Sequence, residues 1–405
     1  MLDKLLYILL LFLSITGANI GFGGIALRDI LTIILFGAMI TKIGLLGDNC
    51  FKAYFIFILC FSMGCIVAEK WDFLILSILR YYMVSFLGWN LTLFFIKKDP
   101  SFKQTLLYTL LIIGLFDAFV TFSQFTMNTT WYSPIESFFK FQVYEGYSAY
   151  ENQFSGNEVY ARYLPGIFGS AAVNGYYLAI CSVLSMFPLL TTKKIYSYFL
   201  PFIFLLATFA CQERSALGIS LIILIYITKR YLSQLNGIQQ FFIIPILIAG
   251  MYLIGLSLFN ISTTFNLRYS SLGADDTGRF EIYRNTLTYI LDYPFFPCVK
   301  ELIDLYGWPP HNIFLNAYVY GGPISFCAIM FILFLQSKKA LLIIKKDFNS
   351  PEQIAVFLFT CGWVVFTLNS LVHNRSVVTG ELLCWVIWGI MDQPHEEEEP
   401  FILNG

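Results

Sequence analysis

The chain has 405 residues, a formal net charge of −1 and a very apolar composition, with 58% hydrophobic and 13% charged residues and a mean hydropathy of +0.70. A soluble domain carries roughly 25% charged residues, so the composition excludes an ordinary soluble protein. Without a basic excess, nothing in the charge indicates nucleic-acid binding.

Apolar segments of membrane-spanning length recur along the whole chain. The first, residues 5–25, could be a secretory signal, but the many segments after it favour an uncleaved first helix. We predict an all-α polytopic membrane protein with about 12 transmembrane helices, forming a single integral membrane domain over residues 1–405. The predicted spans are residues 5–24, 29–47, 52–68, 72–96, 103–125, 165–190, 196–211, 215–232, 238–259, 312–335, 352–372 and 376–391.

The basic residues predict which side each connection faces, because Lys and Arg are retained on the cytoplasmic side. This rule places both termini in the cytoplasm. Lysine then predominates in the inner connections and arginine in the outer ones. The planar guanidinium group suits phosphate and carboxylate, so the outer arginines indicate an anionic ligand or, alternatively, salt bridges with the outer acids.

Two long connections are predicted on the outer side, residues 126–164 and 261–311, and residues 392–405 form an acidic cytoplasmic tail. The first loop is rich in Tyr and Phe, which suits either stacking on sugar rings or a belt at the lipid headgroups. In the second loop, between helices 9 and 10, apolar residues follow helical spacing over residues 279–290, after capping residues at 275–277. We therefore predict a structured second loop, with Arg279 and Arg284 on its helix.

Three charged residues, Arg80, Asp117 and Glu381, fall inside predicted spans, where a charge is costly and indicates function. At about 1.5 Å rise per residue, Arg80 and Asp117 would each lie roughly 12 Å below the outer surface and could pair. We predict a polar cavity open to the outside, or alternatively a structural ion pair.

The short outer turn "CQERSAL" places Glu213 and Arg214 between two apolar spans. Ser215 is a candidate N-cap for the following helix, which would bring a guanidinium group beside free main-chain N–H groups. Such an arrangement predicts an anion site; the alternative is an ordinary hairpin tip.

The segment "WPPHNIFLNAYVYGG" contains His311, one of only three histidines, directly before a span expected from Asn312. The positive end of a helix dipole disfavours protonated histidine, so His311 could accept a proton near neutral pH. Alternatively, His311 or Asn312 only caps the helix. His373, in the outer segment "HNR", is a rival candidate for the base.

The cysteines and histidines give no indication of a metal or another cofactor. The nine cysteines form no CxxC pair, and most of them, Cys65 included, lie in apolar runs and are interpreted as small hydrophobic residues. Three widely separated histidines without an HExxH motif argue against zinc.

Several motifs occur in a characteristic order. His311, Asn312 and Leu315 are followed by the glycine pair Gly321–Gly322. Upstream of them lie the following matching residues: Arg162, Gly166, Phe168, Asn174, Arg214 and the pair Gly278–Arg279. Together these motifs, over residues 160–335, resemble the O-antigen ligase/polymerase superfamily.

This resemblance implies a GT-C-like fold in the bacterial cytoplasmic (inner) membrane and a metal-independent, inverting glycosyltransferase. The donor would be an oligosaccharide on undecaprenyl diphosphate, and the acceptor a lipid-linked repeat or lipid A-core. A chain-length regulator protein and membrane lipid are further partners that it implies.

The resemblance also implies roles for particular residues. His311 would be the catalytic base, and Arg214 and Arg279 would stabilise the diphosphate leaving group. Arg284, Arg162 and Asn312 would bind substrate. Arg80, Asp117 and Glu381, the charged residues within predicted spans, are further candidates for substrate binding in the predicted cavity. We predict an O-antigen or capsule repeat-unit polymerase, with an O-antigen ligase as the alternative. A lipid-linked oligosaccharide flippase is a third reading, but it would predict an internal repeat, and none is visible.

Overall fold

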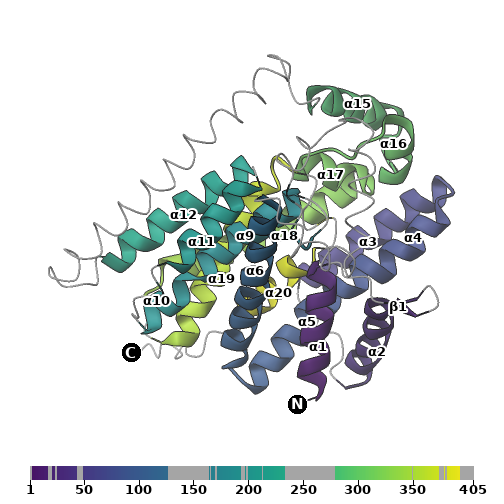
Figure 1. Ribbon diagram of the computed structural model, residues 1–405. Helices are drawn as coiled ribbons and strands as arrows, with labels where there is room; N and C mark the ends of the chain where they lie inside the picture. Colours follow the sequence, from purple (N-terminus) through teal and green to yellow (C-terminus); the bar gives the residue numbers. More distant parts are fainter. Residues whose placement is uncertain are drawn as a thin grey trace, which may run out of the picture.

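The computed structural model describes residues 2–16, 21–22, 25–42, 49–125, 164, 166–168, 171–192, 197, 199–211, 213–232, 279–348, 350–373, 378 and 381–392. In these ranges the regular structure is helical (Figure 1), apart from an antiparallel hairpin of two short strands, β1 (Gly21–Phe22) and β2 (Ile25–Ala26). The predicted all-α class is therefore confirmed for the described residues.

The helices follow one another in chain order and are labelled as in Figure 1. They are α1 (Leu2–Thr16), α2 (Leu27–Lys42), α3 (Asn49–Val67), α4 (Trp71–Ser77), the π-helical turn η1 (Ile78–Tyr82), α5 (Met83–Lys98), α6 (Phe102–Phe125), α9 (Ala171–Leu184), α10 (Met186–Thr192), α11 (Leu200–Ala210), α12 (Arg214–Leu232), α15 (Arg279–Asp292), α16 (Val299–Tyr306), α17 (Ile313–Val319), α18 (Gly322–Lys345), α19 (Pro351–Asn369) and α20 (Leu382–Met391).

Six helical segments of the described chain are long and apolar enough to cross a membrane. They are residues 49–67, 71–98, 102–124, 172–192, 322–345 and 351–369. The predicted spans 5–24, 29–47, 196–211 and 376–391 correspond to shorter helices of 15, 16, 11 and 10 residues. The predicted span 238–259 lies outside the described residues, so the number of about 12 spans stays a prediction.

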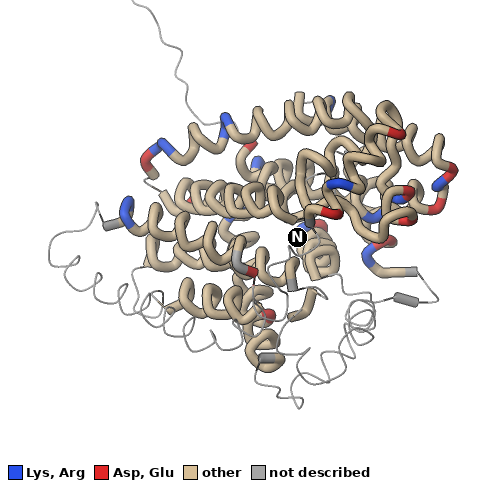
Figure 2. The backbone as a smooth tube through the Cα atoms, turned by 90° about the horizontal axis from the view of Figure 1, so that it is seen from above, with Lys and Arg blue, Asp and Glu red and all other residues tan. Residues whose placement is uncertain are grey.

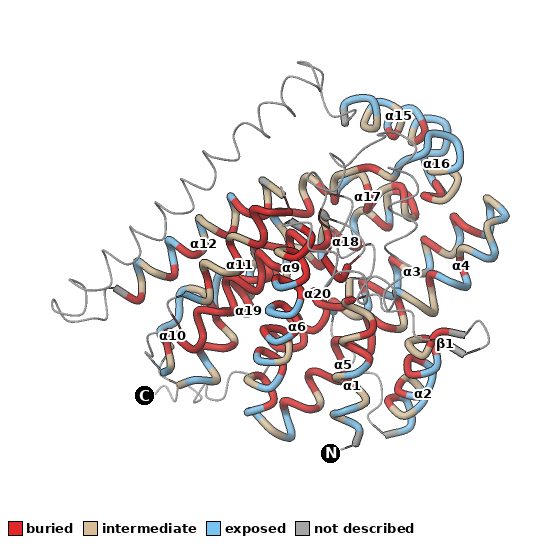
Figure 3. Tube along the Cα trace, in the orientation of Figure 1, coloured by how far each residue is buried: buried red, intermediate tan, exposed pale blue. Residues whose placement is uncertain are grey.

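The centre of the bundle is formed by α20, and all ten of its residues are buried. This helix packs against α5 (Figure 3), and its Trp385 ring centroid lies 4.1 Å from that of Tyr54 on α3. Gly389 allows the close approach to α5, since a Cβ there would lie 2.8 Å from the carbonyl oxygen of Trp89. A helix that is apolar on all sides belongs in a core, which explains why so short a helix is fully enclosed.

The predicted span 312–335 is divided in the structure, and this corrects the prediction of one continuous helix. The first part, α17, ends at Val319, and α18 begins at Gly322. Gly322 has a φ of 78°, a left-handed conformation that favours glycine. Pro323, at the start of α18, lacks the N–H group that would continue the helical hydrogen bonds.

Charged residues are few in the bundle, and the tubes are mostly tan in the view from above (Figure 2). At one end, ion pairs join residues from connections that we predict to be cytoplasmic, namely Lys4 with Asp99 at 2.7 Å and Arg230 with Asp347 at 3.1 Å. The short helices α15, α16 and α17 cluster elsewhere, at the upper right of Figure 1. Which end faces the cytoplasm stays a prediction.

Candidate functional site

The helix predicted over residues 279–290 is confirmed as α15, Arg279–Asp292. Its Tyr283 hydroxyl donates a hydrogen bond of 3.2 Å to the main-chain carbonyl of His311. Arg284, the next residue, is exposed, and Arg279 is the first residue of the helix. The predicted loop helix is therefore attached to the predicted catalytic histidine segment.

Asn312 is the N-cap of α17, as the capping alternative predicted. Its side-chain oxygen accepts hydrogen bonds from the N–H groups of Phe314 and Leu315, at 2.8 and 3.3 Å. Its amide nitrogen donates to the carbonyl of Leu371 at 3.0 Å. The Asn312 side chain therefore attaches α17 to the chain that follows α19. A second hydrogen bond of 3.0 Å, from the Ile313 N–H group to the carbonyl oxygen of Ser370, joins the same two segments.

We expect the Asn312→Ala substitution to lower the free energy of unfolding by about 1–2 kcal/mol, the usual cost of losing an N-cap. Thermal unfolding in detergent measures this loss. Asn312→Asp is the matched control, because it keeps the capping oxygen and should lose less stability. A variant that lost the protein's activity but kept its stability would instead indicate direct substrate binding.

His373, the rival base, lies in a polar cluster between α12 and the end of α19. Its Nε2 lies 3.0 Å from Glu213 Oε2 and 3.1 Å from the Ser215 hydroxyl oxygen. That hydroxyl donates its only hydrogen to the Asn369 side-chain oxygen at 2.8 Å. The Ser215 oxygen must then accept from His373, so Nε2 carries a hydrogen, shared with the Glu213 carboxylate.

This cluster corrects the predicted role of Ser215 as N-cap. The helix α12 begins at Arg214, one residue earlier, and Ser215 is bonded across to α19 instead. His373 is buried, at 7% exposure, whereas Glu213 and Ser215 are half-buried. The Glu213–His373 contact was not predicted, because nothing in the spacing of two residues so far apart indicates that they meet.

The described residues place both histidine segments at one location, which we call the α12–α17–α19 junction: residues 213–215, 311–312 and 369–373. Asn312 bonds to Leu371, two residues before His373, and Arg214 lies between Glu213 and Ser215, which both contact His373. The junction therefore contains two of the three predicted catalytic residues and the rival base. Through Tyr283 it is attached to α15, which begins with the third, Arg279.

Arg80 does not pair with Asp117, and this corrects the predicted partnership. Arg80 lies in the π-helical turn η1 and contacts Asp29 of α2, with its Nη2 3.2 Å and its Nε 3.3 Å from one carboxylate oxygen. The helix α2 packs against η1 and α5, and this packing brings Asp29 to Arg80. Arg80 thus forms an ion pair, as the structural alternative predicted, but with a different acid.

Asp117, on α6, is completely buried and accepts a hydrogen bond of 2.9 Å from the Ile167 N–H group. Beside it, Gly166 has a φ of 56°, and a Cβ there would overlap the Asp117 carboxylate. Gln124 binds the N–H and carbonyl groups of Gly166, and Asn174 binds the carbonyl of Leu164. Two of the motif residues, Gly166 and Asn174, therefore shape this segment; Arg162 lies outside the described residues.

We expect Asp117→Ala to lower the free energy of unfolding by about 2 kcal/mol, because it leaves the buried Ile167 N–H group without an acceptor. Asp117→Asn keeps an acceptor oxygen and should retain most of the stability and activity. Comparing the two variants by thermal unfolding and by an activity assay separates a structural from a functional role. Loss of activity in the stable asparagine variant would show that the negative charge acts on substrate.

Glu381 occupies the N-cap position of α20 rather than the interior of a span, because the helix begins at Leu382. Its carboxylate accepts a hydrogen bond of 3.0 Å from the Tyr176 hydroxyl on α9. The predicted depth of Glu381 inside a helix is therefore corrected. The residue connects α20 to α9 at the end of α20 where the chain enters the core.

No cluster of three or more His, Cys, Asp or Glu residues that could hold a metal ion occurs in the described part of the chain. Comparison of the chain with protein-family models, with curated proteins and with solved structures gave no match. By the length and composition of its helices, the apolar bundle is that of a membrane protein.

Proposed function

We propose that this protein is a membrane glycosyltransferase that transfers an undecaprenyl-diphosphate-linked glycan on the outer face of a bacterial cytoplasmic membrane. Within this class we propose the repeat-unit polymerase of O-antigen or capsule. The observation that carries the proposal is the α12–α17–α19 junction, where the chain segments that contain His311, Arg214 and His373 meet, attached through Tyr283 to a helix that begins with Arg279.

The chemistry of glycosyl transfer requires a base and a cation, the two kinds of residue that these segments contain. The acceptor hydroxyl oxygen attacks the anomeric carbon while the bond from that carbon to the diphosphate oxygen breaks. His311 accepts the hydroxyl proton, and the leaving diphosphate gains negative charge that arginine can stabilise. We assign this second role to Arg214 and Arg279, with Arg284 as an exposed cation for the approaching lipid diphosphate.

The contacts of α15 suggest how the loop contributes. Because Tyr283 bonds to the main chain of His311, the position of α15 is coupled to that of the histidine. Substrate bound by arginines on α15 would therefore be presented to a base held in register with them. This arrangement supports catalysis by positioning, which can supply a large part of a rate enhancement.

His373 has a supporting role in this proposal. Its Nε2 hydrogen is directed at Glu213 and Ser215, an arrangement that orients an imidazole ring. Because Glu213 and Ser215 flank Arg214, His373 holds the turn that presents this arginine. The alternative assignment, with His373 as the base, is tested by substitution of each histidine.

Reconstitution tests the proposal directly. Purified protein in lipid vesicles is supplied with the undecaprenyl-diphosphate-linked repeat in two reactions, one without lipid A-core and one with it. A polymerase extends the lipid-linked repeat without lipid A-core, and a ligase gives product only with it. Movement of intact substrate across the vesicle membrane without new linkages would indicate a flippase and overturn the proposal.

A variant series assigns the effect to the junction. We expect Arg279→Gln and Arg214→Gln to abolish polymer formation while the protein stays folded. Lys70→Gln is a matched control, because Lys70 is a cation engaged with Asp304 of α16 at 2.9 Å and has no proposed role in transfer. Equal losses in all three variants would indicate a general effect of charge.

A further inference from the structure

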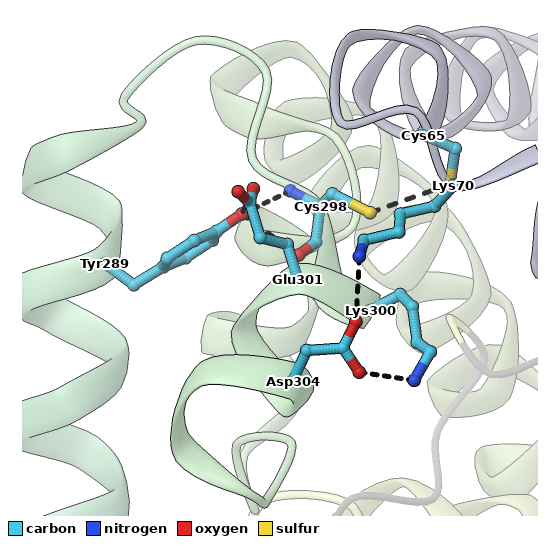
Figure 4. Close-up of polar contacts among 7 residues, drawn as sticks. All are labelled: Cys65, Lys70, Tyr289, Cys298, Lys300, Glu301 and Asp304. Atoms are coloured by element: carbon cyan, nitrogen blue, oxygen red, sulfur yellow. Dashed lines mark hydrogen bonds and ion pairs between the residues drawn. The ribbon is translucent and has the colours of Figure 1, made fainter.

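Two cysteines from distant parts of the chain lie close together at the start of α16. Cys65 lies near the end of α3, and Cys298 is the residue directly before α16. Their sulfur atoms are 3.9 Å apart across 233 residues of sequence, as the dashed line in Figure 4 marks. Both are buried, at 0% and 2% exposure. Cys65 is therefore more than the small hydrophobic residue that the sequence indicated.

The main chains on both sides of the thiols are fixed in close approach. A Cβ on Gly64 would lie 2.5 Å from the carbonyl oxygen of Pro297, so only glycine fits next to Cys65. The N–H group of Cys298 donates to the Tyr289 hydroxyl at 3.0 Å. The two sulfur atoms thus face each other because the surrounding backbone holds them there.

An ion pair near the two thiols also joins α16 to the chain that follows α3. Lys70, in the turn between α3 and α4, lies 2.9 Å from Asp304 of α16 (Figure 4). Lys300 lies 2.5 Å from the same carboxylate. The pKa of Asp304 is below its usual value because of hydrogen bonds from Lys300 and Lys70. The turn after α3 and the helix α16 are therefore already joined next to the thiols.

The hydrogen-bonding environments of the two thiols differ. The pKa of Cys298 is lowered to about 7 by the hydrogen bond with Cys65 and by the N–H groups of Glu301 and Lys300 at the start of α16. A larger thiolate fraction makes Cys298 the better nucleophile for thiol–disulfide exchange. Cys65 is then the resolving thiol, since its sulfur is the nearest partner.

We infer that Cys65 and Cys298 are the two halves of a disulfide that fastens α16 to the end of α3. Closing the bond requires the sulfur atoms to move from 3.9 Å to about 2.05 Å. The link would join the second loop, and through α15 the His311 segment, to the transmembrane bundle. The inference rests on the predicted outer location of this end, where disulfides persist, and not on glycosyl transfer.

The oxidant is a disulfide-carrying oxidoreductase of the outer compartment. The Cys298 thiolate attacks one sulfur of the oxidoreductase's disulfide. This step forms a mixed disulfide between Cys298 and the oxidoreductase and releases the other carrier sulfur as a thiolate. Cys65 then loses its proton and attacks the Cys298 sulfur, which releases the second carrier sulfur. The carrier leaves as a dithiol with two electrons and two protons. Because both cysteines are buried, exchange precedes the packing of residues 294–298 against α3.

Counting thiols in the full-length protein tests the inference. Membranes from aerobically grown cells are denatured in an alkylating reagent, with or without prior reduction, and the modified cysteines are mapped by mass spectrometry. Of the nine cysteines, Cys65 and Cys298 should escape alkylation until reduced, and a cross-linked peptide should contain both. Full alkylation of all cysteines before reduction, or a cross-link between another pair, overturns the inference.

Variants add specificity to this count. Cys65→Ser should make Cys298 fully alkylable without reductant. Cys60→Ser, on the same helix, is the matched control and should leave the cross-link intact. The wild-type count remains decisive if a variant fails to fold. Because no activity is measured, a failed disulfide and a failed glycosyltransferase proposal give separate results.

Discussion

Polymer formation is expected to fall at least about 100-fold when His311 is replaced by glutamine, the typical loss when a general base is removed. The substitution should leave the fold intact, because Tyr283 bonds to the main-chain carbonyl of His311 and not to its side chain. The neighbouring cap also remains, since it is formed by Asn312. The effect should therefore appear in the rate of transfer rather than in thermal stability.

The measurement is the initial rate of transfer from the lipid-linked repeat, recorded over a range of pH. In the wild-type protein the rate should decrease at acidic pH as the base becomes protonated, and the His311→Gln variant should lose that limb of the profile. His373→Gln is the matched control, for which we expect a smaller loss and an unchanged profile. The opposite pattern would make His373 the base and His311 a structural residue.

Most helices could be predicted from the sequence because long apolar runs determine them independently of the rest of the chain. The helix on the second loop was predicted as well, since its apolar residues repeat at helical spacing. The failures have a common cause. At Gly321–Gly322 a helix is broken by a left-handed glycine, and at α20 the helix begins only after Glu381. Hydropathy averages over such single-residue features.

The candidate site was predictable residue by residue but not as a set of contacts. The chemistry of their side chains makes His311, Arg214 and His373 candidates, yet nothing in the sequence indicates that Asn312 bonds to Leu371 or that His373 meets Glu213. Those contacts depend on how α12, α17 and α19 pack. Arg80 shows the same limit. Its place on a helix next to that of Asp117 predicted an ion pair between these two residues, but α2 packs beside Arg80 and its Asp29 is the partner.

The loop and the bundle are coupled through one short segment. Residues 294–298 lie between α15 and α16, and in this segment Pro297 lies against Gly64 of α3 and Phe295 lies against Gly322 at the start of α18. The Tyr318 hydroxyl on α17 donates to the carbonyl of Pro294 at 2.8 Å. A change in this segment would therefore reach both the His311 segment and the thiol pair.

The strongest structural test of this coupling is the substitution Gly322→Ala. Gly322 has a φ of 78°, and a Cβ there would overlap the carbonyl oxygen of Phe295 and lie 2.9 Å from its carbonyl carbon. Both neighbours are main-chain atoms, so neither can rotate away. Because alanine at this position would combine a strained backbone conformation with overpacking, we expect the free energy of unfolding to fall by about 3 kcal/mol or more.

Thermal unfolding in detergent measures this loss, and Gly218→Ala is the matched control. Gly218 lies within α12, where a Cβ would have no neighbouring atom within 4 Å and φ is not positive, so alanine there should be neutral or slightly stabilising. If Gly322→Ala unfolds at the wild-type temperature, residues 295–297 do not contact the start of α18. In a destabilised variant, weaker packing of these residues should also expose Cys298 to alkylation in the folded, reduced protein, because its burial depends on the same segment.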